Sequence, residues 1–165
     1  VGTGKSLKWP AGLAAKGNPG VAGTISQTPG AIGYVGSEYA FSLNIPMAQM
    51  KNSSGNFITP NTERISAAAK GEMTADTRTM ITNSSAPDAY PISCFTWIIL
   101  YKEQAYANRT LAQAQATVKL LDWMLSPEAQ ALTTKVHYSP LPQSAVANAK
   151  TLLNSISFEG KKVLN

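Results

Sequence analysis

An uncharged apolar run, residues 91–101 (PISCFTWIILY), constrains the fold of this 165-residue chain more than any other stretch. It is rich in β-branched and aromatic residues, begins at a proline and ends at the charged pair Lys102 and Glu103. Such a run is typical of a strand that is buried on both faces of a sheet. The sequence therefore predicts a strand over 92–101 that crosses from one lobe to another, with a loop-rich half before it and a helical half after it.

The only cysteine of the chain, Cys94, lies inside this run. A single cysteine excludes an internal disulfide and a zinc site built from cysteines. Because the neighbours of Cys94 in the sequence are apolar, we expect a buried, inert thiol and not a nucleophile.

The charge is moderately basic, with 14 Lys and Arg against 9 Asp and Glu, a formal net charge of +5. The basic residues are dispersed, and Lys161 and Lys162 are the only adjacent pair. Nucleic-acid binding needs a basic patch or stripe, so we expect no nucleic-acid partner. The net charge at most favours small anions. No apolar run has the length that a membrane span needs.

Residues suited to catalysis or metal binding are few. His137 is the only histidine, and the sequence offers it no carboxylate or nucleophile partner, so we expect a surface or capping role. The acidic residues show no spacing typical of a metal site. The sequence predicts no enzyme, no cofactor and no metal.

The first six residues, VGTGKS, end like a phosphate-binding P-loop. The helix that should follow Lys5 would meet Trp9 and Pro10 within about a turn and a half. We therefore expect an exposed turn here, and a P-loop phosphotransferase stays the less favoured alternative function.

Asn18 followed by Pro19 makes a favourable N-cap and first-turn pair, which predicts a helix that ends near residues 28–30. The N-terminus of a helix attracts anions, and a lysine lies beside this one. Lys16, Gly17 and Asn18 are therefore the anion-site candidates of this sequence, although most helix N-termini bind no anion.

Other patterns place further elements along the chain. Before the apolar run they predict strands at 31–35 and 47–50, a helix over 37–41 capped by Ser37, a turn at 52–56, a helix over 60–70 between the caps Thr59 and Gly71, and a weaker helix near 74–82. After the run they predict a helix that starts at a capping box from Thr110 to Gln113, another from Ser126 to about Lys135, and a last one over 143–154.

Several strings of the sequence resemble the phosphate-binding proteins of bacterial phosphate ABC transporters. They run in register from end to end: LKWP at 7–10, KGNPGVA at 16–22, TPGAIGYV at 28–35, AYPIS at 89–93, LLDW at 120–123 and YSPLP at 138–142. The resemblance implies an α/β fold of the periplasmic-binding-protein type (type II), with two lobes that close on phosphate about a hinge. It aligns residues 1–91 with the later part of the second lobe and 92–165 with the return segment into the first lobe.

The resemblance also implies a phosphate site that this sequence lacks. In the family, phosphate is bound by Thr or Ser hydroxyls, backbone amides, an Asp, and an Arg that a Ser-Gly-Thr loop follows. No such Arg loop occurs here, and neither Asp88 nor Asp122 lies in a matching motif. We therefore carry over no phosphate-binding residue and expect the ligands to precede Val1.

The resemblance implies a substrate-binding protein that captures inorganic phosphate and delivers it to a membrane permease. Its location would be the periplasm or the outer face of the bacterial cytoplasmic membrane, secreted or lipid-anchored. We expect this chain to be a C-terminal fragment whose open sheet edge pairs with a missing N-terminal segment or with a second copy. A phosphate-binding-like fold that binds another oxyanion or acts as a surface module is the alternative.

Overall fold

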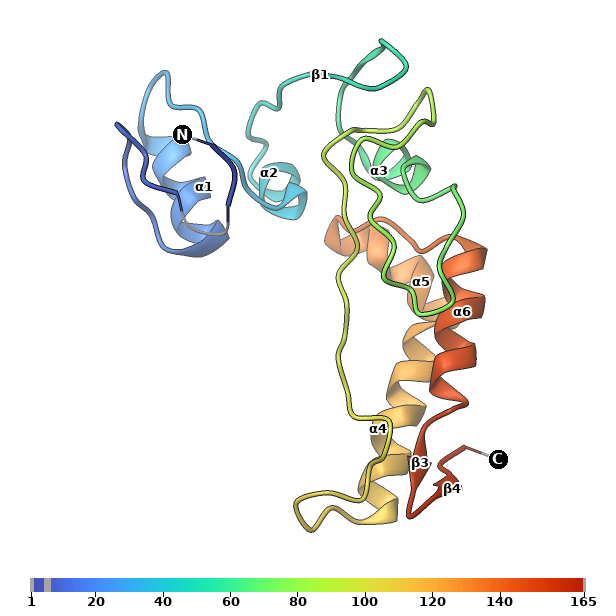
Figure 1. Cartoon of the computed structure of the whole chain (residues 1–165). Helices are drawn as coiled ribbons and strands as arrows, with labels where there is room; N and C mark the ends of the chain where they lie inside the picture. Colours follow the sequence, from blue (N-terminus) through green and yellow to red (C-terminus); the bar gives the residue numbers. More distant parts are fainter. Residues whose placement is uncertain (1, 5–6, 165) are drawn as a thin grey trace. The chain divides into compact units, whose positions relative to one another are not determined.

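The computed structural model describes residues 2–4 and 7–164 (Figure 1). The chain forms two compact units, Val1–Met47 and Ala48–Asn165, and each is described here by itself. The exposed turn predicted at residues 1–6, and its P-loop alternative, depend on residues 1, 5 and 6, which lie outside the described residues.

The first unit contains two helices, α1 (Gly17–Gln27) and α2 (Ser37–Ser42), which contact each other. Ala22 of α1 and Ala40 of α2 are buried. The loop between the helices approaches α1 closely, since a Cβ on Gly33 would lie 2.7 Å from Cδ1 of Ile25. A larger residue at this position would force the Ile25 side chain to move, so the loop packs tightly on the helix here.

Two predictions for residues 31–41 of this unit are wrong. Residues 31–35 form no strand, and Ile32 and Tyr34 are 98% and 82% exposed. A strand needs a neighbour to take its backbone hydrogen bonds, and the described residues of this unit contain no other strand. The predicted helix over 37–41 is confirmed, but its N-cap is Gly36 and not Ser37.

The second unit begins with a small hairpin of β1 (Met50–Lys51) and β2 (Phe57–Ile58), paired antiparallel with Met50 opposite Ile58. The predicted turn at 52–56 joins them, and strand β1 starts at the end of the predicted 47–50. The turn is fixed by Asn52, whose side-chain Oδ1 accepts hydrogen bonds from the backbone N–H groups of Ser54 and Asn56.

Helix α3 (Thr62–Ala67) follows and is shorter than the predicted 60–70. Asn61, not Thr59, is its N-cap, and the Asn61 Oδ1 accepts from the Arg64 N–H at 2.8 Å. Its C-cap is Ala68 and not Gly71. A buried cluster lies at its end, formed by Ala67, Ala68, Ala69, Ile81 and Ala89.

The weaker helix predicted near 74–82 is not formed. Instead, the Thr79 hydroxyl accepts from the Thr74 N–H at 2.8 Å, and the Asp76 carboxylate accepts from the Arg78 N–H at 3.1 Å. Short polar side chains that bond to nearby backbone in this way compete with the helical hydrogen bonds.

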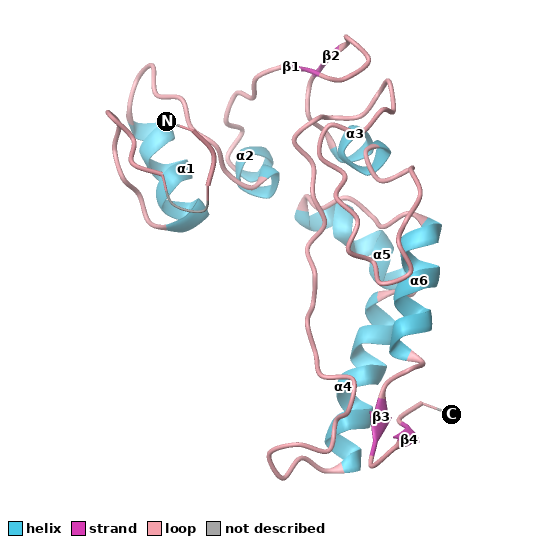
Figure 2. Ribbon diagram, viewed as in Figure 1, coloured by secondary structure: helices cyan, strands magenta, loops and turns pink. Residues whose placement is uncertain are grey.

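The C-terminal half is helical, as predicted. It consists of α4 (Leu111–Met124), α5 (Pro127–Thr133), the 3-10 turn η1 (Thr134–Val136) and α6 (Gln143–Leu153), followed by the hairpin of β3 (Ser157–Phe158) and β4 (Lys161–Lys162). Helices α4 and α6 pack together beside this hairpin (Figure 2). The core between them consists of Ala114, Val118, Leu153, Ile156 and Val163.

Both predicted N-caps of this half are confirmed. Thr110 and Gln113 form a reciprocal capping box at the start of α4. The Ser126 hydroxyl accepts from the Ala129 N–H at 3.2 Å at the start of α5.

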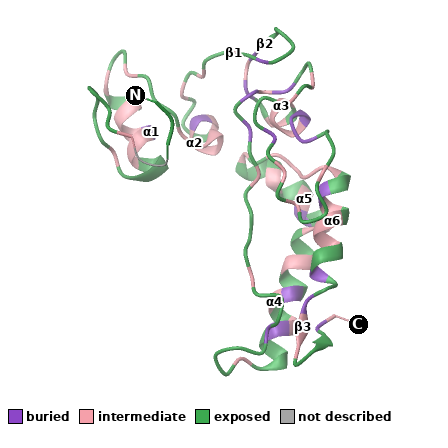
Figure 3. Ribbon diagram, viewed as in Figure 1, coloured by how far each residue is buried: buried purple, intermediate pink, exposed green. Residues whose placement is uncertain are grey.

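The prediction for the apolar run is wrong. Residues 92–101 are extended but belong to no strand, and much of the run is exposed (Figure 3). Ile99 is 92% exposed, and Cys94 is exposed and not buried. A strand is buried on both faces only when sheet neighbours and covering layers surround it. The strands among the described residues are each two residues long and form two hairpins. None of them pairs with 92–101.

Candidate anion site at the start of helix α1

The N-terminus of α1 holds the three residues that the sequence singled out for an anion. Gly17 has φ +64, a left-handed conformation that glycine adopts without strain and that redirects the chain into the helix. The first turn of α1 contains no acidic residue. The unpaired N–H groups of a first turn and the helix dipole therefore give this end a partial positive charge, next to Lys16.

Asn18 does not cap the helix, which corrects the prediction. The N-cap position is occupied by Lys16, whose side chain makes no capping hydrogen bond. The Asn18 Oδ1 instead accepts a hydrogen bond from the Gly36 N–H at 3.3 Å. This contact with the loop before α2 draws the side chain away from the helix N–H groups, and sequence spacing could not reveal it.

Lys16, Gly17 and Asn18 are all exposed. Charges in contact with water are screened strongly, so an anion here would be bound weakly. The geometry brings the three candidates together at one helix end but does not enclose them. Their role in anion binding stays a prediction.

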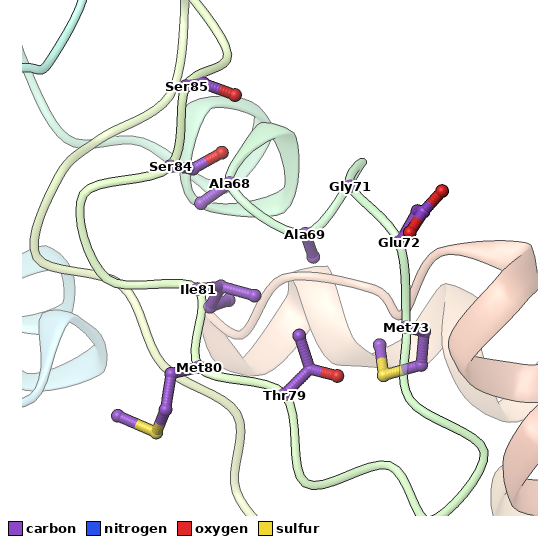
Figure 4. Close-up of a pocket in the computed structure, with 10 residues that line it drawn as sticks. All are labelled: Ala68, Ala69, Gly71, Glu72, Met73, Thr79, Met80, Ile81, Ser84 and Ser85. Carbon is purple, nitrogen blue, oxygen red and sulfur yellow. The ribbon is translucent and has the colours of Figure 1, made fainter.

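A small pocket of about 170 Å³ lies in the second unit (Figure 4). Its walls include Ala69, Met73, Thr79 and Ile81, and Glu72 contributes the one charged group. The lining combines apolar side chains, hydroxyl groups and this single carboxylate, and it contains no basic residue that would offer positive charge to an oxyanion.

The remaining sequence candidates do not line this pocket. His137 has φ +63 and occupies the C-cap of η1, where its N–H donates to the Thr134 carbonyl at 3.2 Å, so the predicted capping role is confirmed. Asp88 pairs with Lys70 at 3.5 Å, and Asp122 lies 3.9 Å from Lys150. The described residues contain no group of three or more metal-ligating side chains. No helix among them is both long and apolar enough to cross a membrane.

The carboxylate of Glu103, which the sequence did not single out, accepts hydrogen bonds from four donors. Glu103 accepts from the Ala105 N–H, the Ser157 hydroxyl, the Glu159 N–H and the Gly160 N–H, at distances of 2.8–3.2 Å. The Ala105 N–H and the Ser157 hydroxyl, followed by the two hairpin N–H groups, lower the pKa of Glu103 to about 2. Three of these donors are 54–57 residues away, so no local signal could have shown the cluster.

Comparison with known families decides the class of the protein. A family model described as "PBP superfamily domain" matches residues 3–128. The chain belongs to the PBP superfamily. This membership confirms the predicted fold class, a periplasmic-binding-protein-like α/β fold, and agrees with the mixture of helices and small sheets.

Proteins named "Phosphate-binding protein PstS" are similar to this PBP-superfamily chain over most of its length. The protein from Xylella fastidiosa (strain Temecula1) is 33% identical over 149 residues, which cover 88% of this chain and 40% of the relative. Those from Pasteurella multocida and Methanocaldococcus jannaschii are 32% and 28% identical and cover 88% and 95% of the chain. The predicted resemblance is thereby confirmed. The chain spans about two fifths of the length of these relatives.

Proposed function

We propose that this chain is part of a substrate-binding protein that captures inorganic phosphate. The observation that carries the proposal is the similarity to PstS proteins over 88% or more of the chain. The protein binds phosphate without covalent chemistry, so it is not an enzyme. It works outside the cytoplasm, in the periplasm or at the outer face of the cytoplasmic membrane, and delivers phosphate to the permease of an ABC transporter.

In this proposal the chain supplies scaffold and hinge elements of a two-lobed protein. Residues 1–91 form the later part of the second lobe, and 92–165 form the return segment into the first. The two compact units of the structure divide between Met47 and Ala48, at a different position from this proposed lobe boundary. Closure of two lobes about a segment such as 92–101 would shield bound phosphate from water.

The groups that bind phosphate are proposed to lie outside residues 1–165, in the part of the relatives that this chain does not span. Two observations support this. The pocket beside α3 carries a carboxylate and no cation, and the N-terminus of α1 is open to water. Selectivity would come from neutral donors and an Arg in a dehydrated cleft, with an Asp that accepts a hydrogen bond from protonated phosphate.

The proposal is tested by calorimetric titration with phosphate of this chain and of the natural protein at full length. We expect no binding heat from residues 1–165 and saturable binding by the full-length protein, with sulfate as a competitor control. Binding by residues 1–165 that Lys16→Ala weakens would place the site at α1 instead. If the full-length protein binds sulfate or another oxyanion but not phosphate, the ligand assignment is wrong.

A further inference from the structure

Side-chain hydrogen bonds join the part of the second unit that precedes the extended segment 92–101 to the part that follows it. The Ser139 hydroxyl donates to the Thr62 carbonyl at 2.8 Å, and the Ser66 hydroxyl donates to the Pro140 carbonyl at 3.2 Å. The partners of these two bonds are separated by 77 and 74 residues in the sequence. Helix α3 and the loop before α6 therefore hold each other reciprocally.

A second bridge joins helix α6 to the loop that follows α3. The Asn148 side-chain amide donates to the carbonyls of Met73 and Thr74, at 3.4 and 3.1 Å. The extended segment contacts the same loop, because the Trp97 indole N–H donates to the Thr77 carbonyl at 3.0 Å. This loop is therefore held both by α6 and by the extended segment.

The bridging bonds share a chemistry that tolerates small rotations. Each is donated by an uncharged side chain to a backbone carbonyl. A carbonyl oxygen accepts over a broad range of directions, and a serine hydroxyl rotates to follow its acceptor. Among the described residues, no ion pair links one side of the extended segment to the other. The two sides can therefore turn slightly against each other without losing these bonds.

We propose that these bridges form a pivot about which the two lobes rotate when the full-length protein closes on its ligand. The inference rests on the proposed function, from which it takes the two lobes and their boundary at 91 and 92. Contacts beside the axis of a rotation move little, whereas distant parts are displaced. The bridges therefore persist in the open and the closed protein. A contact of equal strength in both states stabilises the fold without changing the ratio of the states.

Pulsed-EPR distances in the full-length protein, with Cys94→Ser as background, test the pivot directly. One pair of spin labels, on Lys70→Cys and Gln143→Cys, uses exposed positions on the two sides of the bridges. The other pair, on Lys51→Cys and Lys161→Cys, lies in β1 and β4, far apart in the second unit (Figure 1).

Saturating phosphate should leave the distance of the pair beside the bridges within about 2 Å and change the distance between the strands by more than that. A change in both distances would mean that the bridges open during closure. If neither distance changed, the two parts would not rotate about the bridges at all. Either result would overturn the pivot.

Removing the bridging side chains gives a second, thermodynamic test. In the full-length protein, Asn148→Ala and Ser139→Ala should lower the denaturant midpoint of unfolding. Both should leave the phosphate dissociation constant within about twofold of the parent value, because the open and closed states lose the same bonds. Thr151→Ala is the matched control, since its hydroxyl bonds to the Ala147 carbonyl inside α6, and it should shift the midpoint less. A change of about fivefold or more in the dissociation constant would show that the bonds belong to one state only, and the pivot would be refuted.

Failure of the pivot can be told apart from failure of the proposed function. If calorimetry shows that the full-length parent protein binds no phosphate, the proposed function is wrong. If the parent protein binds sulfate instead, the EPR distances and the dissociation constants are measured with sulfate. The unfolding measurement uses no ligand, so unchanged midpoints for both Asn148→Ala and Ser139→Ala would overturn the bridges whatever the ligand is.

Discussion

Glu103 and Ser157 contact each other through both backbone and side chain, although they lie 54 residues apart in the sequence. Their backbones form a parallel bridge, and the Ser157 hydroxyl donates to the Glu103 carboxylate at 2.8 Å. The same carboxylate accepts from two N–H groups of the turn between β3 and β4. This contact fixes the C-terminal hairpin to the end of the extended segment.

The first prediction concerns the pH dependence that Glu103 creates. Its pKa is about 2 in the folded chain, against an ordinary value of 4.5. Because folding lowers the pKa, the contribution of Glu103 to stability is complete above pH 4.5 and is lost as the pH falls from 4.5 toward 2. Glu103→Gln should therefore flatten the acid side of the stability curve, as measured by denaturant unfolding at several pH values.

The matched control for Glu103→Gln is Glu72→Gln, which removes an exposed carboxylate away from the hairpin. Between pH 2 and 4.5, this variant's free energy of unfolding should change with pH about as steeply as that of the parent chain. If the free energy of unfolding of Glu103→Gln changed with pH as steeply as that of the parent, the four hydrogen bonds to Glu103 would not be the source of the pH dependence.

The second prediction concerns Asn52, which is 5% exposed and joins two loops. Its Nδ2 donates to the carbonyls of Pro87 and Ala89 at 3.0 and 3.3 Å, and its Oδ1 accepts from two N–H groups of its own turn. Asn52→Ala should lower the free energy of unfolding by about 1–3 kcal/mol, because buried polar groups lose their partners. Asn52→Asp, which keeps the acceptors and loses the donors, should also destabilise. Unchanged unfolding curves for both variants would refute this role.

The third prediction concerns the capping box of α4. Thr110→Ala removes the hydroxyl that accepts from the Gln113 N–H at 3.2 Å. The loss should be about 1 kcal/mol in the free energy of unfolding. Ser144→Ala, an exposed serine in the first turn of α6, serves as control and should cost less. Equal effects of the two substitutions on urea unfolding would mean that the capping box contributes nothing specific.

The fourth prediction concerns the core between α4 and α6. Val118 is fully buried, and Val118→Ala removes two methyl groups from the cluster that holds Leu153 and Ile156. The free energy of unfolding should fall by about 2 kcal/mol, the transfer cost of those groups plus the cavity. Leu120→Ala on the same helix, 55% exposed, should cost less than half as much. Comparable losses would show that α4 packs through a different face.

The helical half could be predicted from sequence because its signals are local. The capping box at Thr110 and the cap at Ser126 act within one turn, and both are confirmed. The prediction of a buried strand for residues 92–101 is wrong because burial depends on neighbouring segments. Its composition is that of a core strand, yet Ile99 is almost fully exposed in this chain.

The candidate anion site likewise combines a feature that the local sequence predicts with features that depend on distant residues. The sequence correctly placed Lys16, Gly17 and Asn18 at the start of a helix. It could not show that Asn18 bonds to Gly36, 18 residues away, or that all three residues are exposed. Both facts depend on how the loop before α2 folds back on α1.

Motifs and interactions a few residues apart were enough to predict the superfamily, the helices of the second half and the N-caps at Thr110 and Ser126. Folding alone shows that Asn18 bonds to Gly36 instead of capping α1, and that Glu103 accepts hydrogen bonds from the distant hairpin. It also shows that 92–101 pairs with no strand among the described residues. The physical reason is that hydrogen-bond partners and burial come from segments brought together by folding, and a single stretch of sequence does not contain them.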